Sequence, residues 1–253
     1  MLAIAQPAMH WSGDDNTIGM LAILARAAKA GAAICVFPEL AVTGYHRQIG
    51  GAAKPELVDR WVAAVTEACA KHRVAAAFGA PTFGEDGRIF NSYLFVEATG
   101  VVVGHVEKAG LTPPEVTFFA TGRVRQTVEL QGLRCSAVIC REVEDFAEVC
   151  ADLEHQAPDV IFWPGLMGPE PGTEHIDPPS HVVQAQRLAA RLGAHVVQSN
   201  WPVSLNYPEL SVNTGKSVVI GPGGDIAFAL PRAEAGLAVF TLGSDIHDWQ
   251  RQT

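Results

Sequence analysis

The sequence alternates short apolar runs with longer amphipathic segments, and it does so twice in the same order. Each half is expected to run strand, helix, strand and hairpin, and the second half holds one additional helix–strand unit. This order predicts an α/β protein with two mixed β-sheets packed face to face and helices on the outer faces, a four-layer αββα sandwich. The expected strands are Leu2–Gln6, Ile34–Phe37, Val74–Gly79, Arg88–Glu97, Val101–Lys108, a run ending at Cys140, Asp159–Trp163, Ala194–Asn200, Lys216–Gly221, Asp225–Leu230 and Gly236–Leu242. The expected helices are Thr17–Lys29, with a cap at Asp14, Asp15 or Asn16, then Pro55–Arg73, Glu144–Gln156 and Ser180–Leu192.

Composition limits the kinds of partner that the chain can have. A hydrophobic content of 48% suits a large core, and no linker divides the sequence, so we expect a single domain over residues 1–253. The formal net charge is −9 and basic residues do not cluster, which argues against nucleic acid and anionic membranes as partners. Apolar runs are too short to span a bilayer, and the first residues lack the pattern of a signal peptide. We therefore expect a cytoplasmic protein.

The five cysteines are odd in number and lie mostly within apolar patterns, without any Cys-x-x-Cys spacing. A disulfide framework or a zinc site is therefore not expected. His175 and His181 lie in a Pro/Gly-rich loop, Gly165–Ser180, but two histidines do not make a metal site. We expect neither a metal nor another cofactor.

Three chemically versatile residues each follow an apolar strand. Glu39 comes after Ile34–Phe37 and Pro38, Lys108 ends the second strand of a hairpin, and Cys140 follows Ala137, Val138 and Ile139. Taken singly, these would be a solvated glutamate, a surface lysine and a small buried cysteine. Strand ends meet at one rim in open α/β sheets, and that rim usually carries the chemistry. Together the three residues predict a single site.

The surrounding motifs resemble those of the nitrilase (carbon–nitrogen hydrolase) superfamily, in a consistent order from residue 2 to about residue 240. The matching pieces are Ala3-Ile4-Ala5-Gln6, Phe37-Pro38-Glu39-Leu40 with Thr43-Gly44-Tyr45, Phe90-Asn91-Ser92, Lys108 followed by Glu115, Phe119 and Gly122, Ile139-Cys140-Arg141-Glu142, Gly215-Lys216-Ser217, and Gly221-Pro222-Gly223-Gly224. The resemblance implies the αββα fold, a catalytic triad of Glu39, Lys108 and Cys140, an auxiliary glutamate at Glu115, and at least a homodimer.

The chemistry of these residue types agrees with that assignment. A free thiol is only a few per cent ionised near neutral pH, so Cys140 needs a base such as Glu39 to become a nucleophile. Attack on an amide carbonyl creates an oxyanion, for which the Lys108 ammonium and the Arg141 backbone N–H are the expected donors. Glu39 then protonates the leaving ammonia or amine and activates the water that hydrolyses the thioester.

The sequence departs from the family pattern directly after the cysteine. Many relatives have an aromatic residue there, and nitrile-hydrolysing members usually show Cys-Trp-Glu and a longer C-terminal extension; this chain has Arg141 and stops soon after its last predicted strand. Both features favour an amide or carbamoyl substrate. Arg141 is expected either to bind a substrate carboxylate or to pair with Glu142 or Glu144. Tyr45, Arg141, Glu142 and Met167 are the expected substrate-binding residues, and the Gly165–Ser180 loop is expected to shape the pocket.

The sequence therefore predicts a thiol amidohydrolase that cleaves a C–N bond of a small linear amide or an N-carbamoyl compound. Three alternatives stay open: a nitrilase, an acyltransferase in which an amine replaces water, and a binding scaffold that has lost catalysis. Release of ammonia from an amide separates the first prediction from the acyltransferase and the scaffold.

Overall fold

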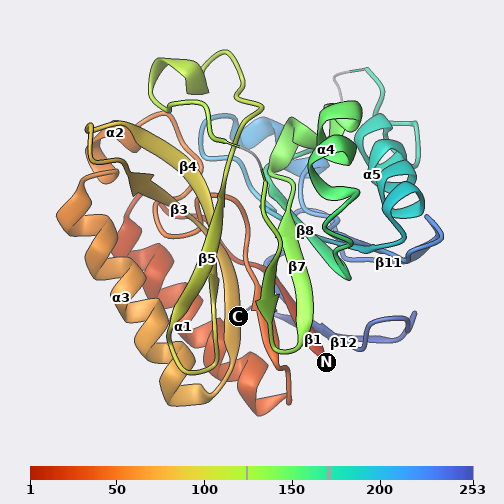
Figure 1. The fold of residues 1–253 in the computed structure, drawn as a ribbon, viewed down its shortest axis with the longest axis horizontal. Helices are drawn as coiled ribbons and strands as arrows, with labels where there is room; N and C mark the ends of the chain where they lie inside the picture. Colours follow the sequence, from red (N-terminus) through yellow and green to blue (C-terminus); the bar gives the residue numbers. More distant parts are fainter. Residues whose placement is uncertain (124, 170–171, 253) are drawn as a thin grey trace.

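Two mixed β-sheets form the centre of the protein (Figure 1). The structure is a computed structural model, which describes residues 1–123, 125–169 and 172–252. The larger sheet has the strand order β13-β12-β1-β2-β3-β4-β5, and the smaller has the order β11-β10-β9-β8-β7-β6. Strands β1 to β3 and β7 to β9 are parallel, and their flanking strands are antiparallel. The strands are β1 (Leu2–Gln6), β2 (Ile34–Val36), β3 (Ala75–Phe83), β4 (Ile89–Val96), β5 (Val102–Glu107), β6 (Val128–Leu130), β7 (Leu133–Ala137), β8 (Val160–Gly165), β9 (His195–Asn200), β10 (Val218–Ile220), β11 (Ile226–Ala229), β12 (Gly236–Phe240) and β13 (His247–Arg251).

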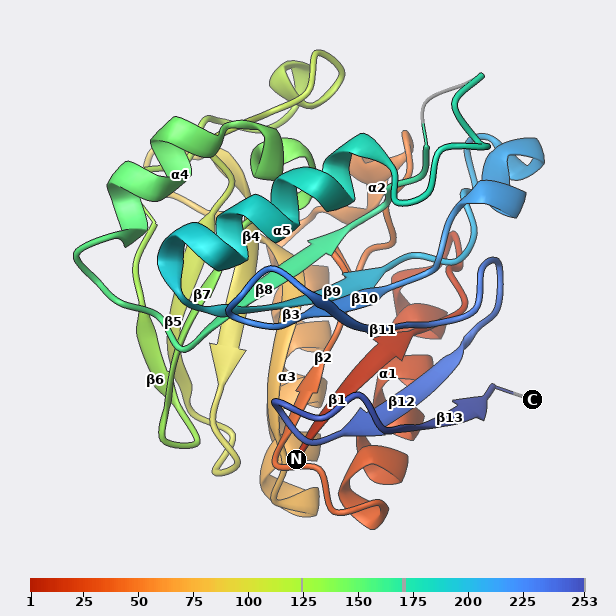
Figure 2. The same cartoon turned by 90° about the vertical axis from the view of Figure 1, so that its right-hand side faces the viewer.

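Helices cover the outer face of each sheet, as Figures 1 and 2 show. One apolar cluster joins α1 (Gly13–Lys29) and α3 (Pro55–His72) to the larger sheet, and another joins α4 (Phe146–Leu153) and α5 (Ser180–Leu192) to the smaller sheet. A third cluster lies between the sheets. These three apolar layers confirm the predicted αββα sandwich. The shorter elements are α2 (Ile49–Ala52) and the 3-10 helices η1 (Glu115–Thr117), η2 (Cys140–Glu144) and η3 (Pro208–Asn213).

Local signals explain the ends of the two helices on the larger sheet. Helix α1 begins earlier than predicted because Ser12 is its N-cap and accepts a hydrogen bond from the backbone N–H of Asp15. Asn16, one of the predicted caps, instead bonds both backbone groups of His10. Helix α3 begins at Pro55 as predicted, and Arg73 ends it in the left-handed conformation, with φ of 54°.

The strand predicted to reach Cys140 ends earlier, and β6, α2 and β13 were not predicted. Strand β7 stops at Ala137, and Cys140 instead begins η2. Strand β6 is only three residues long, α2 is four residues long, and β13 has the mostly polar sequence HDWQR, so none of them carries a periodic apolar signal. Their places depend on contacts with segments far away in the chain.

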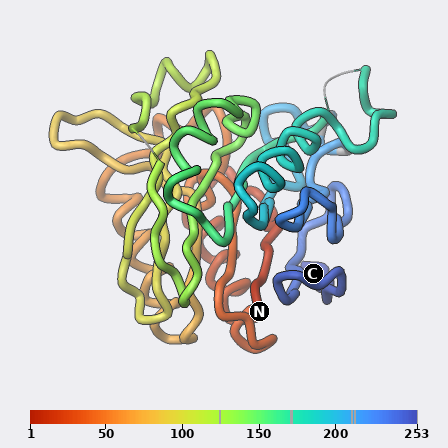
Figure 3. Tube along the Cα trace, turned by 45° about the vertical axis from the view of Figure 1, so that its right-hand side comes forward, coloured from red at the N-terminus to blue at the C-terminus, as the bar shows by residue number. Residues whose placement is uncertain are grey.

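The last strands return to the sheet on which the chain began (Figure 3). Strand β12 pairs with β1, with Leu2 opposite Phe240 and Gln6 opposite Gly236, and β13 pairs with β12. The N-terminal and C-terminal strands therefore lie in the same sheet. Within the described part of the chain, none of the helices has the length and apolarity needed to cross a membrane.

Candidate active site

Glu39 is placed by a tight crossing of backbone directly after β2. Trp201 donates from its indole N–H to the Glu39 carbonyl at 2.8 Å. Gly79 of β3 lies beneath this segment, and a Cβ atom at that position would be only 2.0 Å from the backbone nitrogen of Leu40. A glycine is therefore required at position 79, and the Glu39 side chain is held in a fully buried position.

Lys108 is fully buried between two carboxylates. It directly follows β5, and its Nζ donates to Glu39 Oε1 at 2.7 Å and to Glu115 Oε1 and Oε2 at 2.8 and 2.9 Å. Asn91 of β4 donates from Nδ2 to both glutamates, at 2.8 Å to Glu39 and 3.1 Å to Glu115. A single ammonium group thus holds two buried carboxylates together, with an amide between them.

Cys140 begins η2 in a backbone conformation that is uncommon for a residue with a side chain. Its φ is 56°, and its carbonyl accepts a hydrogen bond from the indole N–H of Trp163 at 2.9 Å. Gly165, at the end of β8, allows the close approach, because a Cβ there would be 3.2 Å from the Cα atom of Cys140. Strained single residues of this kind are concentrated at functional sites.

The charges of Glu39, Lys108 and Glu115 all act on the Cys140 thiol. Burial raises the pKa of Cys140 to about 12, the negative charge of Glu39 adds to this, and Lys108 opposes it. Glu39, Lys108 and Glu115, from distant parts of the sequence, are therefore in direct contact, and their charges influence the Cys140 thiol. The Cys140 thiol is therefore neutral near pH 7, and a nucleophilic role would require a base to take its proton.

Glu39 has the protonation behaviour of such a base. Burial raises its pKa to about 7, because desolvation of the carboxylate outweighs the attraction of Lys108. The pKa of Glu115 falls instead, because Lys108 and hydrogen bonds from Thr112 more than offset its desolvation. Glu39 Oε2 is buried without a hydrogen-bond partner among the described residues. One glutamate is therefore held as a carboxylate, and the other has a free oxygen and can exchange a proton near neutral pH.

Glu142 joins the segments that carry Lys108 and Cys140. Its Oε1 accepts from the backbone N–H groups of Ala109 and Gly110, at 2.7 and 2.9 Å, and its Oε2 accepts from Ile139 N–H at 2.7 Å. Arg125, which is also buried, pairs with the same carboxylate at 2.7 Å. Both oxygens are thus occupied by the protein. Glu142, expected to bind substrate, has contacts that suit a positioning residue instead.

We expect Glu142→Gln to lower the free energy of unfolding by about 3–5 kcal/mol, because it removes one partner of a buried ion pair. It also places an NH₂ group against backbone N–H donors. Urea denaturation followed by circular dichroism measures the change. Glu154→Gln is the matched control, since its pair with Arg191 at 2.6 Å is exposed and is expected to contribute about 0–1 kcal/mol. Equal losses in the two variants would contradict the positioning role.

The other predicted substrate residues lie around this centre. Burial raises the pKa of Tyr45, and the negative charge of Glu39 adds to this effect. Met167 follows β8. A Cβ atom at Gly165 would be 3.2 Å from Met167 Cγ and 3.2 Å from Cys140 Cα, so both residues lie beside Gly165. Arg141 pairs with Asp145 at 2.5 Å, so its acidic neighbour is neither Glu142 nor Glu144, the two residues considered from the sequence.

A cavity of about 660 Å³ reaches Glu115 and Tyr45 from the surface. Its lining is mainly apolar and aromatic, and includes Leu40, Ile49, Phe118, Phe119 and Tyr207. Glu115 is the polar group that connects this space to Lys108. The cavity is the natural approach for a small molecule to the buried network. None of the described residues form a cluster of three or more His, Cys, Asp or Glu that would suit a metal ion.

Sequence reasoning gave no role to Asn91, Trp163 or Trp201. Asn91 has a recognisable signal, because it is a polar residue inside the apolar β4 sequence IFNSYLFV and is fully buried. The tryptophans look like ordinary core residues in the sequence. Their indole N–H groups bond the carbonyls of Cys140 and Glu39, which only the folded chain reveals.

Comparisons with known proteins identify the family and the fold of the chain. The glutamine-dependent NAD(+) synthetase of Acinetobacter baylyi is 25% identical over 236 residues, which are 91% of this chain and 42% of that protein. The chain thus spans less than half the length of the curated relative that it matches.

Among solved structures, an amidase from Nesterenkonia sp. matches 93% of this chain and 87% of its own with a TM-score of 0.79 and 21% identity. The glutamine-dependent NAD+ synthetase of Acinetobacter baumannii matches 100% of this chain and 47% of its own, with a TM-score of 0.78 and 23% identity. The family model for carbon-nitrogen hydrolases covers residues 1–251. Because that model spans nearly the whole sequence, this chain belongs to the carbon-nitrogen hydrolase family.

Proposed function

We propose that the protein is a thiol amidohydrolase that cleaves small linear amides through a thioester on Cys140. The observation that carries the proposal is the buried Oε2 of Glu39, which has no hydrogen-bond partner among the described residues. The pKa of this carboxyl group is raised to about 7, and its negative charge raises the pKa of the Cys140 thiol. A base and a nucleophile are thereby provided in one water-poor site, with the Lys108 ammonium beside them.

In the proposed reaction, Glu39 takes the thiol proton as Cys140 Sγ attacks the amide carbonyl carbon. The oxyanion is stabilised by Lys108 Nζ and the Arg141 backbone N–H. Glu39 returns the proton to the leaving nitrogen, and ammonia or an amine departs as the C–N bond breaks. A water molecule that gives its proton to Glu39 then hydrolyses the thioester, releasing the acid and the free thiol. Glu115 keeps Lys108 in place at 2.8 Å.

Similar proteins support an amide substrate. One of them is an amidase from Nesterenkonia sp., and in a structure of a mutant of that protein acrylamide is joined by Michael addition to the active-site cysteine, which shows that this cysteine is nucleophilic. The Acinetobacter baylyi relative is glutamine-dependent, so glutamine is included among the amides to be tested.

We expect uncharged aliphatic amides to be hydrolysed with a higher kcat/KM than N-carbamoyl amino acids. The cavity beside Glu115 is mainly apolar, the arginine of its lining, Arg47, already donates to the Tyr207 hydroxyl, and Arg141 is already paired with Asp145. Ammonia release from propionamide, butyramide, glutamine, N-carbamoyl amino acids and a nitrile tests this order. A preference for N-carbamoyl amino acids that disappears in Arg141→Gln would show that Arg141 binds the substrate instead.

A further inference from the structure

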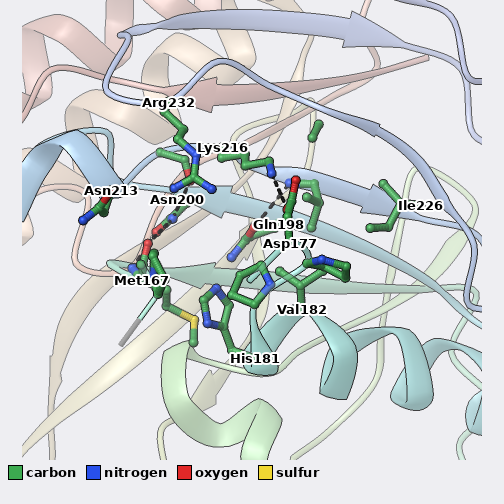
Figure 4. Close-up of a pocket in the computed structure, with 17 residues that line it drawn as sticks. Met167, Asp177, His181, Val182, Gln198, Asn200, Asn213, Lys216, Ile226 and Arg232 are labelled. Atoms are coloured by element: carbon green, nitrogen blue, oxygen red, sulfur yellow. Dashed lines mark hydrogen bonds and ion pairs between the residues drawn. The ribbon is translucent and has the colours of Figure 1, made fainter. Parts of the chain in front are cut away.

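A second cavity, of about 350 Å³, lies on the outer face of the smaller sheet (Figure 4). Val196 of β9 and Val218 of β10 belong to the apolar cluster beneath the helices on this face. Gln198 and Asn200 follow Val196 at every second position of β9, so their side chains point to the same face. The lining also includes the beginning of α5, residues 167–169 and 177–179, and residues between Asn213 and Arg232, and it contains none of Glu39, Lys108, Glu115 and Cys140. The cavity therefore shares Met167 with the surroundings of Cys140 but contains none of the residues that take part in the proposed reaction.

Gln198 brings an unsatisfied hydrogen-bond donor to this cavity. The residue is 1% exposed, and its Oε1 accepts from Val218 N–H at 3.3 Å, which assigns the other end of the amide as the NH₂ group. That Nε2 has no hydrogen-bond partner among the described residues, and Figure 4 shows the Gln198 side chain directed into the cavity. A buried amide donor without an acceptor is costly, so this position calls for a ligand that accepts hydrogen bonds.

The charges around Gln198 favour an anion. Lys216 and Arg232 are the cations of the lining and Asp177 is its carboxylate, which pairs with Lys216 at 2.6 Å at the exposed rim. In the part of the chain that the structure describes, Arg232 has no ion pair, although its charge acts on His181 and Asp177. Burial and the charge of Arg232 lower the pKa of His181 to about 4, so this imidazole is neutral at pH 7. One positive charge is left unbalanced.

Two backbone features contribute to the positive potential of the cavity: the N-terminal end of α5 and the turn that positions Lys216. The cavity includes Pro179 and His181 at the beginning of α5, a helix of 13 residues whose N-terminal end carries partial positive charge. Lys216 has a φ of 49° and follows Gly215 with a φ of 75°, so a left-handed turn delivers the lysine to the cavity. A cavity with an unbalanced positive charge is unusual on a chain whose formal net charge is −9.

We propose that this cavity binds a small carboxylate or phosphate anion, which accepts hydrogen bonds from Gln198 Nε2 and the Arg232 guanidinium and lies near Lys216. Carboxylate and phosphate oxygens accept both kinds of bond, and a guanidinium can hold either group with two parallel bonds. The binding site does not depend on amide hydrolysis at Cys140, and its test therefore measures binding.

The test is isothermal titration calorimetry of the whole chain with inorganic phosphate, acetate and succinate, in a low-salt buffer at pH 7. We expect one site per chain, and the anion that binds best identifies the carboxylate or phosphate source. Arg232→Gln should weaken that binding about 10- to 100-fold, the effect of losing a hydrogen bond to a charged group. Arg191→Gln is the matched control, because Arg191 is a cation near the other end of α5 and should leave affinity unchanged.

Gln198→Met provides the second variant, since it removes the buried donor with little change in volume and should weaken binding as well. Circular dichroism verifies that it folds, and Arg232→Gln decides the question if it does not, because Arg232 is only partly buried. Absence of binding by all three anions at millimolar concentration would overturn the proposal. Wild-type affinity in Arg232→Gln would do so too.

Discussion

Cys140→Ala is expected to lower kcat for amide hydrolysis by roughly 10⁶-fold, the loss found when a covalent nucleophile is removed from a comparable catalytic triad. The thiol is the proposed group that forms a bond to the substrate, and Glu39 and Lys108 act on a reaction that it must begin. The side chain is small and 7% exposed, so the alanine should leave the fold intact. Ammonia release under substrate excess, with circular dichroism of the same samples, measures both quantities.

Cys135→Ala is the control for this experiment. Cys135 is fully buried in β7, and burial raises its pKa to about 12, as it does for Cys140, but Glu39 and Lys108 are not among the charges that act on it. Its alanine variant should keep wild-type turnover. Wild-type enzyme quenched in acid during hydrolysis of a slow ester or amide should carry the acyl mass on Cys140 alone. An acyl group on another cysteine would refute the mechanism, and so would undiminished turnover in Cys140→Ala.

Glu39, Lys108 and Cys140 could be singled out because each follows an apolar run, and polar residues at strand ends often carry the chemistry of α/β proteins. The sequence did not show how they meet, because β2 and β5 are separated by two strands and β7 lies in the other sheet. Glu39 and Lys108 do follow β2 and β5. The start of α3 and the end of α5 were predictable for a similar reason, since Pro55 and Gly193 are strong local signals for starting and ending a helix. Local signals and strand periodicity thus account for the layers of the fold.

The roles of Glu142 and Arg141 were not predictable, because they depend on partners that the sequence does not bring together. Glu142 is three residues from Ile139 and 17 residues from Arg125, yet it bonds both, together with Ala109 and Gly110. Arg141 has acidic residues at several nearby positions, and the turn of η2 selects Asp145. The left-handed backbone of Cys140 was equally hidden, because cysteine gives no local signal for positive φ.

Glu39→Gln is expected to lower kcat/KM by about 10²–10⁴-fold, the usual contribution of a general base. In the wild-type enzyme, kcat/KM should rise with pH to a plateau with an inflection near 7, because the carboxylate is the active form and burial raises its pKa to about 7. The residual activity of the variant should lack that rise. An inflection near 7 that persists in Glu39→Gln would assign it to another group.

The raised pKa of Glu39 also predicts how the free energy of unfolding changes with pH. An ordinary salt-bridged carboxylate stabilises the fold more as pH rises, whereas Glu39 should stabilise it less. The folded protein holds the proton more tightly than the unfolded chain, in which the pKa is about 4.5, so this stabilising effect is complete below pH 4.5 and lost as pH rises through 7. The difference in unfolding free energy between wild type and Glu39→Gln should therefore fall by about 3 kcal/mol between pH 4.5 and pH 8. Urea denaturation across this range measures it. A difference that grows with pH would mean that Lys108 stabilises the Glu39 carboxylate more than burial disfavours it, and that Glu39 is ionised throughout the catalytic range.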